Sequence, residues 1–203
     1  MKKVLVAFML GLVSISILGQ DVSILQDENL GDHRQIQTDY TPMAKKGLVE
    51  LPFSLQYVST KYSSEAYYTM TFKLTLGSVP QSLPSGSKMY LKLDNDSILE
   101  FETMNDIAEY DSTFQYMELF GCLYYYMYPT YYASSEQIDM LMKHKVVKIR
   151  RQVTWGEGFY DIPDNRVFKQ KHICFTENLI RMKLSIDKRL NAANNQNALL
   201  EGF

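Results

Sequence analysis

The chain has 203 residues and a nearly balanced charge, with 21 basic and 23 acidic residues and a formal net charge of −2. This mildly acidic balance argues against a nucleic-acid partner, because proteins that bind nucleic acids usually carry a basic patch. The length suits one domain with a sizeable core, since single domains commonly run from about 100 to 200 residues.

The N-terminus has the pattern of a secretory signal peptide over residues 1–19. Two lysines precede an uncharged apolar run over 4–18, and Gly19 precedes a polar segment. A run of about 15 apolar residues suits the h-region of a signal peptide, whereas a membrane-spanning helix needs roughly 20. The sequence therefore predicts a secreted or periplasmic protein with no membrane span in the mature chain.

Three further segments follow the leader. Residues 20–46 are polar and show no sustained period, which predicts a mobile N-terminal arm. A single β-rich domain is expected over 47–192. Residues 193–203 are rich in asparagine and alanine and are expected to form a disordered tail.

Alternating apolar residues predict the first strands, because period-two alternation marks a strand with one buried face. Residues 49–57 alternate in this way, and Pro52 places the strand at a sheet edge because proline lacks an N–H group. Residues 68–76 alternate most cleanly. Residues 89–93 and 98–102 flank four turn-forming residues, which predicts a β-hairpin.

The later part of the chain mixes strands with two helices. Residues 113–132 are apolar on both faces and predict a long central strand or a bulged pair that bends at Gly121. Ser134 and Gln137 form a capping-box pattern for a short helix over 134–144. Two strands follow, joined by a glycine turn after Trp155.

An amphipathic helix is predicted near the C-terminus from apolar residues spaced by three or four positions. These residues are Phe175, Leu179, Met182, Ile186 and Leu190. Strands that come first, with helices placed late, predict an α+β fold. We expect mainly antiparallel β-sheet or a β-sandwich, with one short helix and a C-terminal amphipathic helix.

Cys122 and Cys174 are the two cysteines of the chain. Export would place them where disulfides form and persist, so a bridge between them is one interpretation. It would close a loop of about 50 residues and stabilise the fold by about 4 kcal/mol in the chain-entropy model. The alternative is a pair of buried free thiols that act as small hydrophobic residues.

The sequence predicts no metal site and no cofactor. The three histidines are far apart and lack the spacing of metal ligands. Asp94-Asn95-Asp96-Ser97 offers oxygen ligands for calcium but lacks the central glycine and the final glutamate of an EF-hand loop. A plain hairpin turn is the simpler interpretation.

Catalysis is the less favoured of two hypotheses. Paired carboxylates on strands would allow a small secreted hydrolase. The candidate carboxylates are Glu100, Glu102, Glu118 and Asp111. Acidic residues on the wet face of a strand usually keep a protein soluble, so we expect a non-catalytic protein.

The tyrosines give the leading hypothesis, because tyrosine combines a flat apolar ring with a polar tip that suits interfaces. The candidate ligand-binding residues are Tyr124, Tyr126, Tyr128, Tyr131, Tyr132 and Trp155. An aromatic strip of this kind would bind a protein or a glycan. The alternative is that the rings fill the core, since aromatic residues are common in strands.

The chain resembles a loose class of secreted proteins of Gram-negative gut bacteria that has no established activity. The resemblance lies in the signal peptide, the hairpin over 90–98, and the stretch from Tyr131 to Arg150 in which a strand leads into a helix and a further strand. These segments cover about a quarter of the chain. The resemblance implies export and a β-rich architecture, and it implies no site residues.

Overall fold

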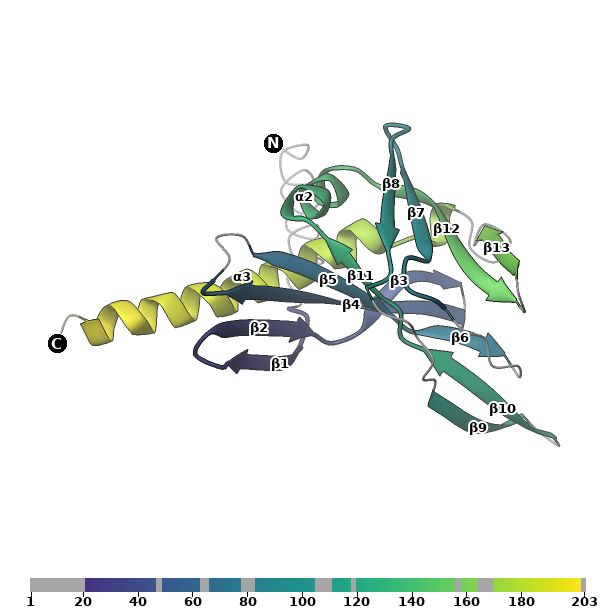
Figure 1. Cartoon of the computed structure of the whole chain (residues 1–203), viewed down its shortest axis with the longest axis horizontal. Helices are drawn as coiled ribbons and strands as arrows, with labels where there is room; N and C mark the ends of the chain where they lie inside the picture. Colours follow the sequence, from purple (N-terminus) through teal and green to yellow (C-terminus); the bar gives the residue numbers. More distant parts are fainter. Residues whose placement is uncertain are drawn as a thin grey trace, which may run out of the picture.

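The computed structural model describes residues 21–46, 49–62, 66–77, 83–104, 111–117, 120–155, 158–163 and 170–201. The predicted signal peptide over 1–19 lies outside these residues. The described chain has the predicted α+β fold, with mainly antiparallel sheets, a short helix and a long C-terminal helix (Figure 1).

The largest sheet has six strands, in the order β1-β2-β4-β5-β11, and β3 pairs with β4. The strands are β1 (Ile24–Asn29), β2 (His33–Thr38), β3 (Thr41–Lys46), β4 (Val49–Thr60), β5 (Tyr67–Phe72) and β11 (Thr130–Ala133). Helix α3 (Phe175–Glu201) packs against β2, β3 and β4 on one side of this sheet. We call that side the inner face and the opposite side the outer face.

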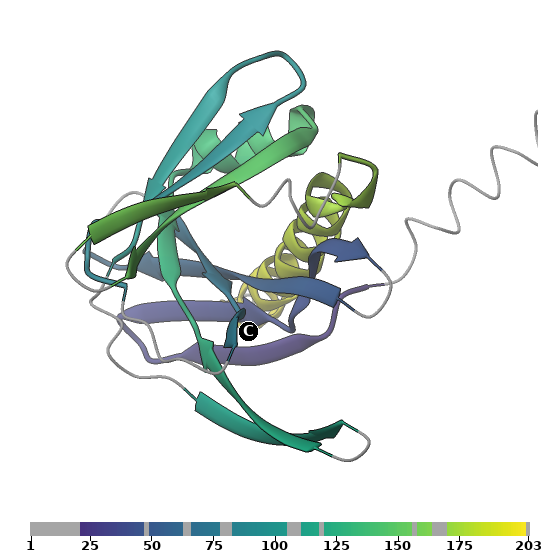
Figure 2. The same ribbon diagram turned by 90° about the vertical axis from the view of Figure 1, so that its right-hand side faces the viewer.

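Two smaller sheets complete the fold. A four-stranded sheet has the order β13-β12-β7-β8, and a three-stranded sheet has the order β6-β10-β9. Their strands are β6 (Leu74–Gly77), β7 (Lys88–Leu93), β8 (Ile98–Glu102), β9 (Asp111–Met117), β10 (Phe120–Met127), β12 (Val146–Trp155) and β13 (Gly158–Pro163). In Figure 2 the four-stranded sheet stands above the six-stranded sheet, and the β9–β10 hairpin extends from the opposite end.

The core lies between the inner face, α3 and the four-stranded sheet. Phe53 of β4 stacks on Phe72 of β5, with ring centroids 5.7 Å apart, and on Phe175 of α3, with centroids 4.7 Å apart. Other fully buried side chains come from every layer: Leu55, Met70, Met89, Leu91, Leu93, Leu179, Met182 and Ile186. The alternation of apolar residues in the sequences of β5 and β7 therefore correctly predicts which side chains of these strands face the core.

The N-terminal segment is the first correction to the sequence predictions. Residues 24–46 form β1, β2 and β3 instead of a mobile arm. Ile36, Met43 and Ala44 are fully buried, and the Val22 amide donates to Ser185 Oγ of α3 at 3.0 Å. Only a few apolar residues of this segment are buried, so the sequence shows no alternation of apolar and polar residues here.

Pro52 is the second correction, because β4 lies inside the sheet and not at its edge. On one side, the Pro52 carbonyl accepts from the Lys73 amide at 2.9 Å. On the other side, Pro52 lies opposite Pro42 of β3, next to an irregularity in the strand register. Because neither proline has an N–H group, no backbone donor is left without a partner where the two residues face each other. This explains how an internal strand accommodates Pro52.

The tyrosine-rich segment is the third correction. Strands β9 (111–117), β10 (120–127) and β11 (130–133) form here, and not one long strand or a pair with a bulge at Gly121. Met117 lies opposite Phe120, so β9 and β10 form a hairpin whose connection precedes Gly121. Gly121 itself lies within β10, opposite Tyr116.

The C-terminal boundary also differs from the prediction. Helix α3 continues to Glu201, so residues 193–201 are helical where a disordered tail was expected. The predicted amphipathic pattern stops near Leu190, and the helix extends beyond it. Periodicity marks only the part of the helix that packs on the sheet.

Helix α2 (Ser135–Lys143) begins with the predicted capping box. Ser134 Oγ accepts from the Gln137 amide at 3.2 Å, and Gln137 Oε1 accepts from the Ser134 amide at 2.9 Å. These two bonds satisfy backbone donors that the first turn of a helix leaves without a partner. Ile138 and Leu141 bury the opposite side of the helix in the core.

Replacing Ser134 with alanine is therefore expected to lower the free energy of unfolding by about 1 kcal/mol. The substitution removes the acceptor for the Gln137 amide and leaves the apolar packing of the helix unchanged. Urea denaturation monitored by circular dichroism measures the change. Ser135→Ala, which alters an exposed serine one residue later, is the control. Equal stability of Ser134→Ala and wild type would contradict the role of the cap.

Candidate functional site

The outer face of the six-stranded sheet carries polar, uncharged side chains at its centre. Ser54 lies opposite Thr71, and Gln56 lies opposite Thr69, across β4 and β5. Thr71 lies opposite Thr130 of β11 in turn. Because side chains alternate along a strand, these residues face away from the buried Phe53 and Met70 side of the sheet.

Hydrogen bonds between neighbouring strands join these side chains. Thr69 Oγ1 donates to Gln56 Oε1 at 2.9 Å, and Gln37 Nε2 of β2 donates to Ser54 Oγ at 3.3 Å. The Thr71 and Thr130 hydroxyl oxygens lie 2.9 Å apart. Ser54 and Thr69 are buried in this row, whereas Gln56 and Thr71 are half-buried and keep hydrogen-bonding capacity toward the surface. Gln56, for example, uses its oxygen for Thr69 and keeps two amide N–H donors.

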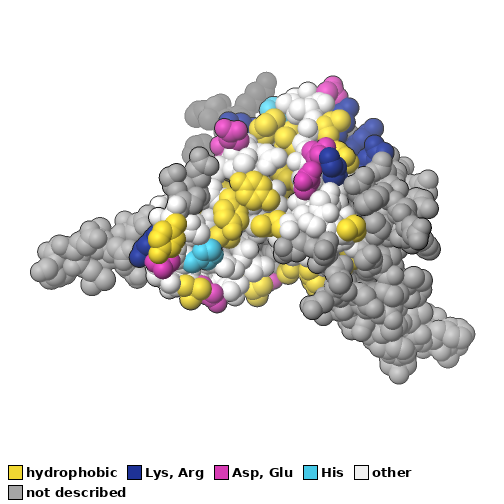
Figure 3. Space-filling model, viewed as in Figure 1, with side chains coloured by type: hydrophobic (Ala, Val, Ile, Leu, Met, Phe, Trp, Pro, Cys, Tyr) yellow, Lys and Arg dark blue, Asp and Glu magenta, His cyan; other side chains and the backbone are white. Residues whose placement is uncertain are grey.

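A pair of tyrosines lies at one end of this row. The rings of Tyr67 in β5 and Tyr132 in β11 have centroids 5.5 Å apart and are tilted by 33°. Tyr132 is 47% exposed. In Figure 3 hydrophobic side chains, a class that includes tyrosine, gather in the middle of this side of the molecule, over β5 and β11.

A second group of tyrosines surrounds Lys73 at the other end of the row. The Lys73 ammonium lies 4.6 Å from the ring centre of Tyr126 and 5.9 Å from that of Tyr128, within the range of cation–π attraction. The edge of Tyr40 meets Tyr128, with ring centroids 6.3 Å apart. Met127, between Tyr126 and Tyr128, is buried on the core side.

The hydroxyl of Tyr40 is kept protonated by its surroundings. Burial raises its pKa above the ordinary value; the hydrogen bond with Ser54 lowers the pKa in part, and the Asp39 carboxylate raises it further. A protonated phenol keeps both donor and acceptor capacity. Tyr40 therefore connects the second tyrosine group to the row of polar side chains.

The two tyrosine groups are separated by most of the length of β5. Tyr67 and Lys73 are six residues apart, which corresponds to about 20 Å along an extended strand. The outer face is therefore an elongated strip with aromatic rings at both ends and hydrogen-bonding groups between them. We call it the tyrosine strip, formed by Tyr40, Tyr67, Tyr126, Tyr128 and Tyr132 with Lys73, Gln56 and Thr71.

Three of the six residues predicted from sequence belong to this strip, namely Tyr126, Tyr128 and Tyr132. Tyr131 does not, because it is fully buried on the inner face and meets the Phe72 ring edge-on at a centroid distance of 5.5 Å. The side chains of Tyr124 and Trp155 lie outside the described part of the structure. Tyr40, Tyr67 and Lys73 were missed.

Cys174 is a free thiol in the structure. Its Sγ donates to the carbonyl of Pro42 at 3.2 Å. The side chain of Cys122 lies outside the described residues, so its pairing stays a prediction from the sequence. Burial raises the pKa of the Cys174 thiol, and the Glu177 carboxylate raises it further.

Cys174 is therefore expected to react slowly with iodoacetamide in the folded protein at pH 8, because the thiolate is the reacting species and its fraction is reduced. A Cys122→Ser variant isolates the reaction of Cys174. Mass spectrometry compares the rate of modification in buffer with that in urea, where the thiol regains its ordinary pKa. Equal rates in both solvents would contradict the predicted protection.

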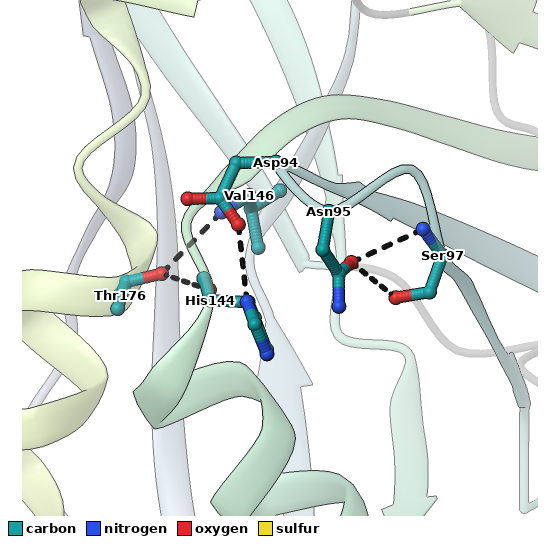
Figure 4. A network of polar contacts seen from close by, with 6 residues as sticks. All are labelled: Asp94, Asn95, Ser97, His144, Val146 and Thr176. Carbon is teal, nitrogen blue, oxygen red and sulfur yellow. Dashed lines mark hydrogen bonds and ion pairs between the residues drawn. The ribbon is translucent and has the colours of Figure 1, made fainter.

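The Asp94–Ser97 segment forms a hairpin turn that contacts His144, the residue after helix α2 (Figure 4). Asn95 Oδ1 accepts from the amide and the hydroxyl of Ser97 at 3.1 and 2.6 Å. Asp94 meets His144 at 3.2 Å, and Asp96 meets Lys92 at 2.7 Å. These contacts stabilise the segment as a hairpin turn, which is the simpler of its two interpretations from the sequence.

The same region connects the end of α2 to the start of α3. Thr176 Oγ1 donates to the His144 carbonyl at 3.1 Å and accepts from the Val146 amide at 3.4 Å. The Asp94 amide donates to the Lys145 carbonyl at 2.9 Å. The β7–β8 turn and the start of α3 thus both bond to the segment that follows α2.

Two of the carboxylates considered for hydrolysis have described side chains, and both contact one lysine. Glu100 and Glu102 lie on β8 and contact Lys88 at 2.5 and 3.7 Å. The side chains of Asp111 and Glu118 lie outside the described residues. In the described ranges no three histidine, cysteine or acidic side chains gather into a metal-binding group.

Of the helices in the described part of the chain, none combines the length and the apolar character needed to cross a membrane. Comparisons with models of protein families, with curated proteins and with solved structures find no significant match for this chain. Functional inference therefore depends on the geometry and chemistry of the tyrosine strip.

Proposed function

We propose that this protein is an exported, non-catalytic binding protein that holds a glycan chain on the tyrosine strip. The observation that carries the proposal is the outward Tyr67–Tyr132 pair, which lies beside a row of uncharged hydrogen-bonding side chains. Export follows from the signal-peptide pattern at residues 1–19 and would bring the protein to the glycans of the cell exterior.

The chemistry of a sugar ring matches these groups. One face of a pyranose is largely C–H and packs on a flat aromatic ring, whereas its hydroxyl groups require donors and acceptors at the rim. Tyr67 and Tyr132 provide rings for the first contact. The Gln56 amide and the Thr71 hydroxyl, both of half-buried residues, provide groups for the second.

The length of the strip favours a chain-like ligand. About 20 Å separates its ends along β5, which is longer than a single sugar ring. Tyrosines at both ends would hold sugar units that are several positions apart in one polymer. A monosaccharide would engage only one of the two tyrosine groups.

A glycan fits this face better than a folded protein does. Stable protein interfaces have a central apolar core surrounded by a polar rim. The tyrosine strip has the reverse order, because the half-buried side chains at its centre are the polar Gln56 and Thr71 and its rings lie at the ends.

Isothermal titration calorimetry against a panel of soluble polysaccharides tests the proposal. We expect at least one to bind, and Tyr132→Ala to weaken that binding about 10-fold through loss of an aromatic contact. Leu184→Ala is the control, because Leu184 on α3 is 45% exposed and lies away from the strip. Absence of binding across the panel, or equal weakening by the control, would overturn the proposal.

A further inference from the structure

A row of glutamine side chains crosses the outer face of the six-stranded sheet. The strand register pairs Gln26 of β1 with Gln37 of β2, and Gln37 with Gln56 of β4. Gln56 lies opposite Thr69 of β5, and Thr69 lies opposite Tyr132 of β11. We call Gln26, Gln37 and Gln56 the glutamine row. It leads from the edge strand β1 to Tyr132 at one end of the tyrosine strip.

The amides of this row keep hydrogen-bonding capacity toward the surface. All three glutamines are half-buried, so part of each side chain reaches the solvent. Gln56 uses its oxygen for Thr69 and keeps two N–H donors. Gln37 donates one N–H to Ser54, and its carbonyl oxygen and second N–H remain for further bonds. Amides that donate and accept are suited to sugar hydroxyls, which also do both.

The glutamine row and the row beside it carry little charge. Two residues further along each strand, a second register row runs from Glu28 through Gln35 and Val58 to Tyr67. The Glu28 carboxylate is the one charged group in the two rows, and it lies exposed on the edge strand β1. An anionic polymer would meet a like charge here and no cation in either row, whereas hydroxyl groups meet amides.

The glutamine row and the tyrosine strip run in different directions. The strip follows β5, whereas a register row lies across the strands. Neighbouring strands are about 4.8 Å apart, so the row covers about 19 Å between Gln26 and Tyr132. The two tracks are therefore similar in length and meet nearly at a right angle beside Tyr132. In Figure 3 a mostly white area, the colour of polar uncharged side chains and backbone, extends from the central hydrophobic patch toward β1 and β2.

We propose that the glutamine row is a second glycan-binding track, and that the ligand is an uncharged, branched polysaccharide. Its backbone would lie along the tyrosine strip, and a side branch would leave it beside Tyr132 and cross the sheet toward Gln26. A linear chain would have to turn through about a right angle to use both tracks. This inference rests on the proposed function, because it names the class of glycan.

A glycan branch fits the row better than a protein partner does. Strand β1 is an edge of the sheet, so a peptide is able to pair with its backbone. Such pairing would take place beside the sheet and would not involve Gln37 or Gln56. A protein seated on the row itself would need buried aromatic or arginine anchors at its centre, and the centre of the row consists of amides.

Amylopectin and a branched α-mannan test the inference, because both are uncharged and carry branches several sugar units long. Isoamylase removes the branches of the first polymer and an α-mannosidase removes those of the second, which gives trimmed polymers of the same sugars. Isothermal titration calorimetry compares branched with trimmed polymers at equal concentrations of sugar. The wild-type chain is compared with the double variant Gln26→Ala, Gln37→Ala.

Asn191→Ala is the control variant, because it removes an exposed carboxamide from α3. Thermal melting shows whether each variant is folded. Branched polymers also present more ends per molecule, and this multivalency would raise their affinity for every variant alike. The double variant therefore separates a contact with the row from a general effect of branching.

We expect the wild-type chain to bind the branched polymers about 10-fold more tightly than the trimmed ones, through hydrogen bonds to the row. The double variant should lose this preference and bind the trimmed polymers as the wild type does. Asn191→Ala should match the wild type, and Tyr132→Ala should weaken both kinds of polymer because both tracks include its ring. Carboxymethylation of the branched polymers should weaken their binding.

Equal affinity of the wild-type chain for branched and trimmed polymers would contradict the inference, and so would an unchanged preference in the double variant. Binding of linear polysaccharides without binding of either branched probe would contradict it too. In these cases glycan binding on the tyrosine strip would stand. A carboxymethylated polymer that binds as tightly as the unmodified one would contradict the uncharged class. If no polysaccharide binds at all, the proposed function fails together with this inference.

Discussion

Tyr131→Ala is expected to lower the free energy of unfolding by about 3–5 kcal/mol, the range measured for large aromatic residues replaced in protein cores. Tyr131 has no exposed surface and meets the edge of Phe72 inside the core. Truncation removes this contact and leaves a cavity between β11 and β5. The same substitution at Tyr132 should cost less than about 1 kcal/mol, because only a cross-strand contact with Tyr67 is lost.

Urea denaturation of the two variants measures this difference directly. The two residues are neighbours in one strand and identical in chemistry, so each variant serves as the control for the other. The comparison depends only on which face of β11 each ring occupies. A larger loss of stability for Tyr132→Ala than for Tyr131→Ala would show that the two faces are assigned the wrong way round.

Phe53→Ala is expected to have a similarly large effect, again about 3–5 kcal/mol. Phe53 stacks on both Phe72 and Phe175 and so joins β4 and β5 to the first turn of α3. Loss of the ring removes two aromatic contacts and opens a cavity at the centre of the core. Phe53→Leu keeps much of the volume and should cost considerably less.

Guanidinium denaturation followed at the helix signal near 222 nm measures the effect of both Phe53 variants. Leu184→Ala, at an exposed position of α3, should change stability by no more than about 0.5 kcal/mol and provides the surface control. An effect of Phe53→Ala as small as that of the control would contradict the packing of α3 on the sheet.

Several strands and one helix could be predicted from the sequence because interactions between residues close in the chain determine them. The alternation in β7 identified its buried residues; in β5 it identified the residues that face the core, although Thr69 on the other face is buried too. The capping box of α2 was visible because Ser134 and Gln137 make their bonds within one turn. The hairpin of β7 and β8 followed from its four turn-forming residues.

Other elements depend on contacts between distant residues. Strands β1 to β3 bury few residues each, and their place in the sheet comes from pairing with β4. The internal position of Pro52 depends on Pro42 lying opposite it, a register that single-strand patterns do not encode. The helical extension of α3 beyond Leu190 lies outside the amphipathic pattern.

The tyrosine strip was partly foreseeable. Tyr131 and Tyr132 are adjacent in a strand and must face opposite sides, so alternation alone shows that only one of them belongs to the strip. Tyr67 shares the face of Thr69 by the same argument. Tyr40 follows β2 without a periodic signal, and only the folded sheet brings it to Tyr128.

The measurement that tests the account most directly is tyrosine nitration mapped by mass spectrometry, with and without a bound polysaccharide. We predict that Tyr132 is nitrated in the free protein and protected when polysaccharide is bound, whereas Tyr131 is unmodified in both samples. Nitration of Tyr131 as readily as Tyr132, or nitration of Tyr132 that is unchanged by a polysaccharide shown to bind, would contradict a glycan site on the outer face.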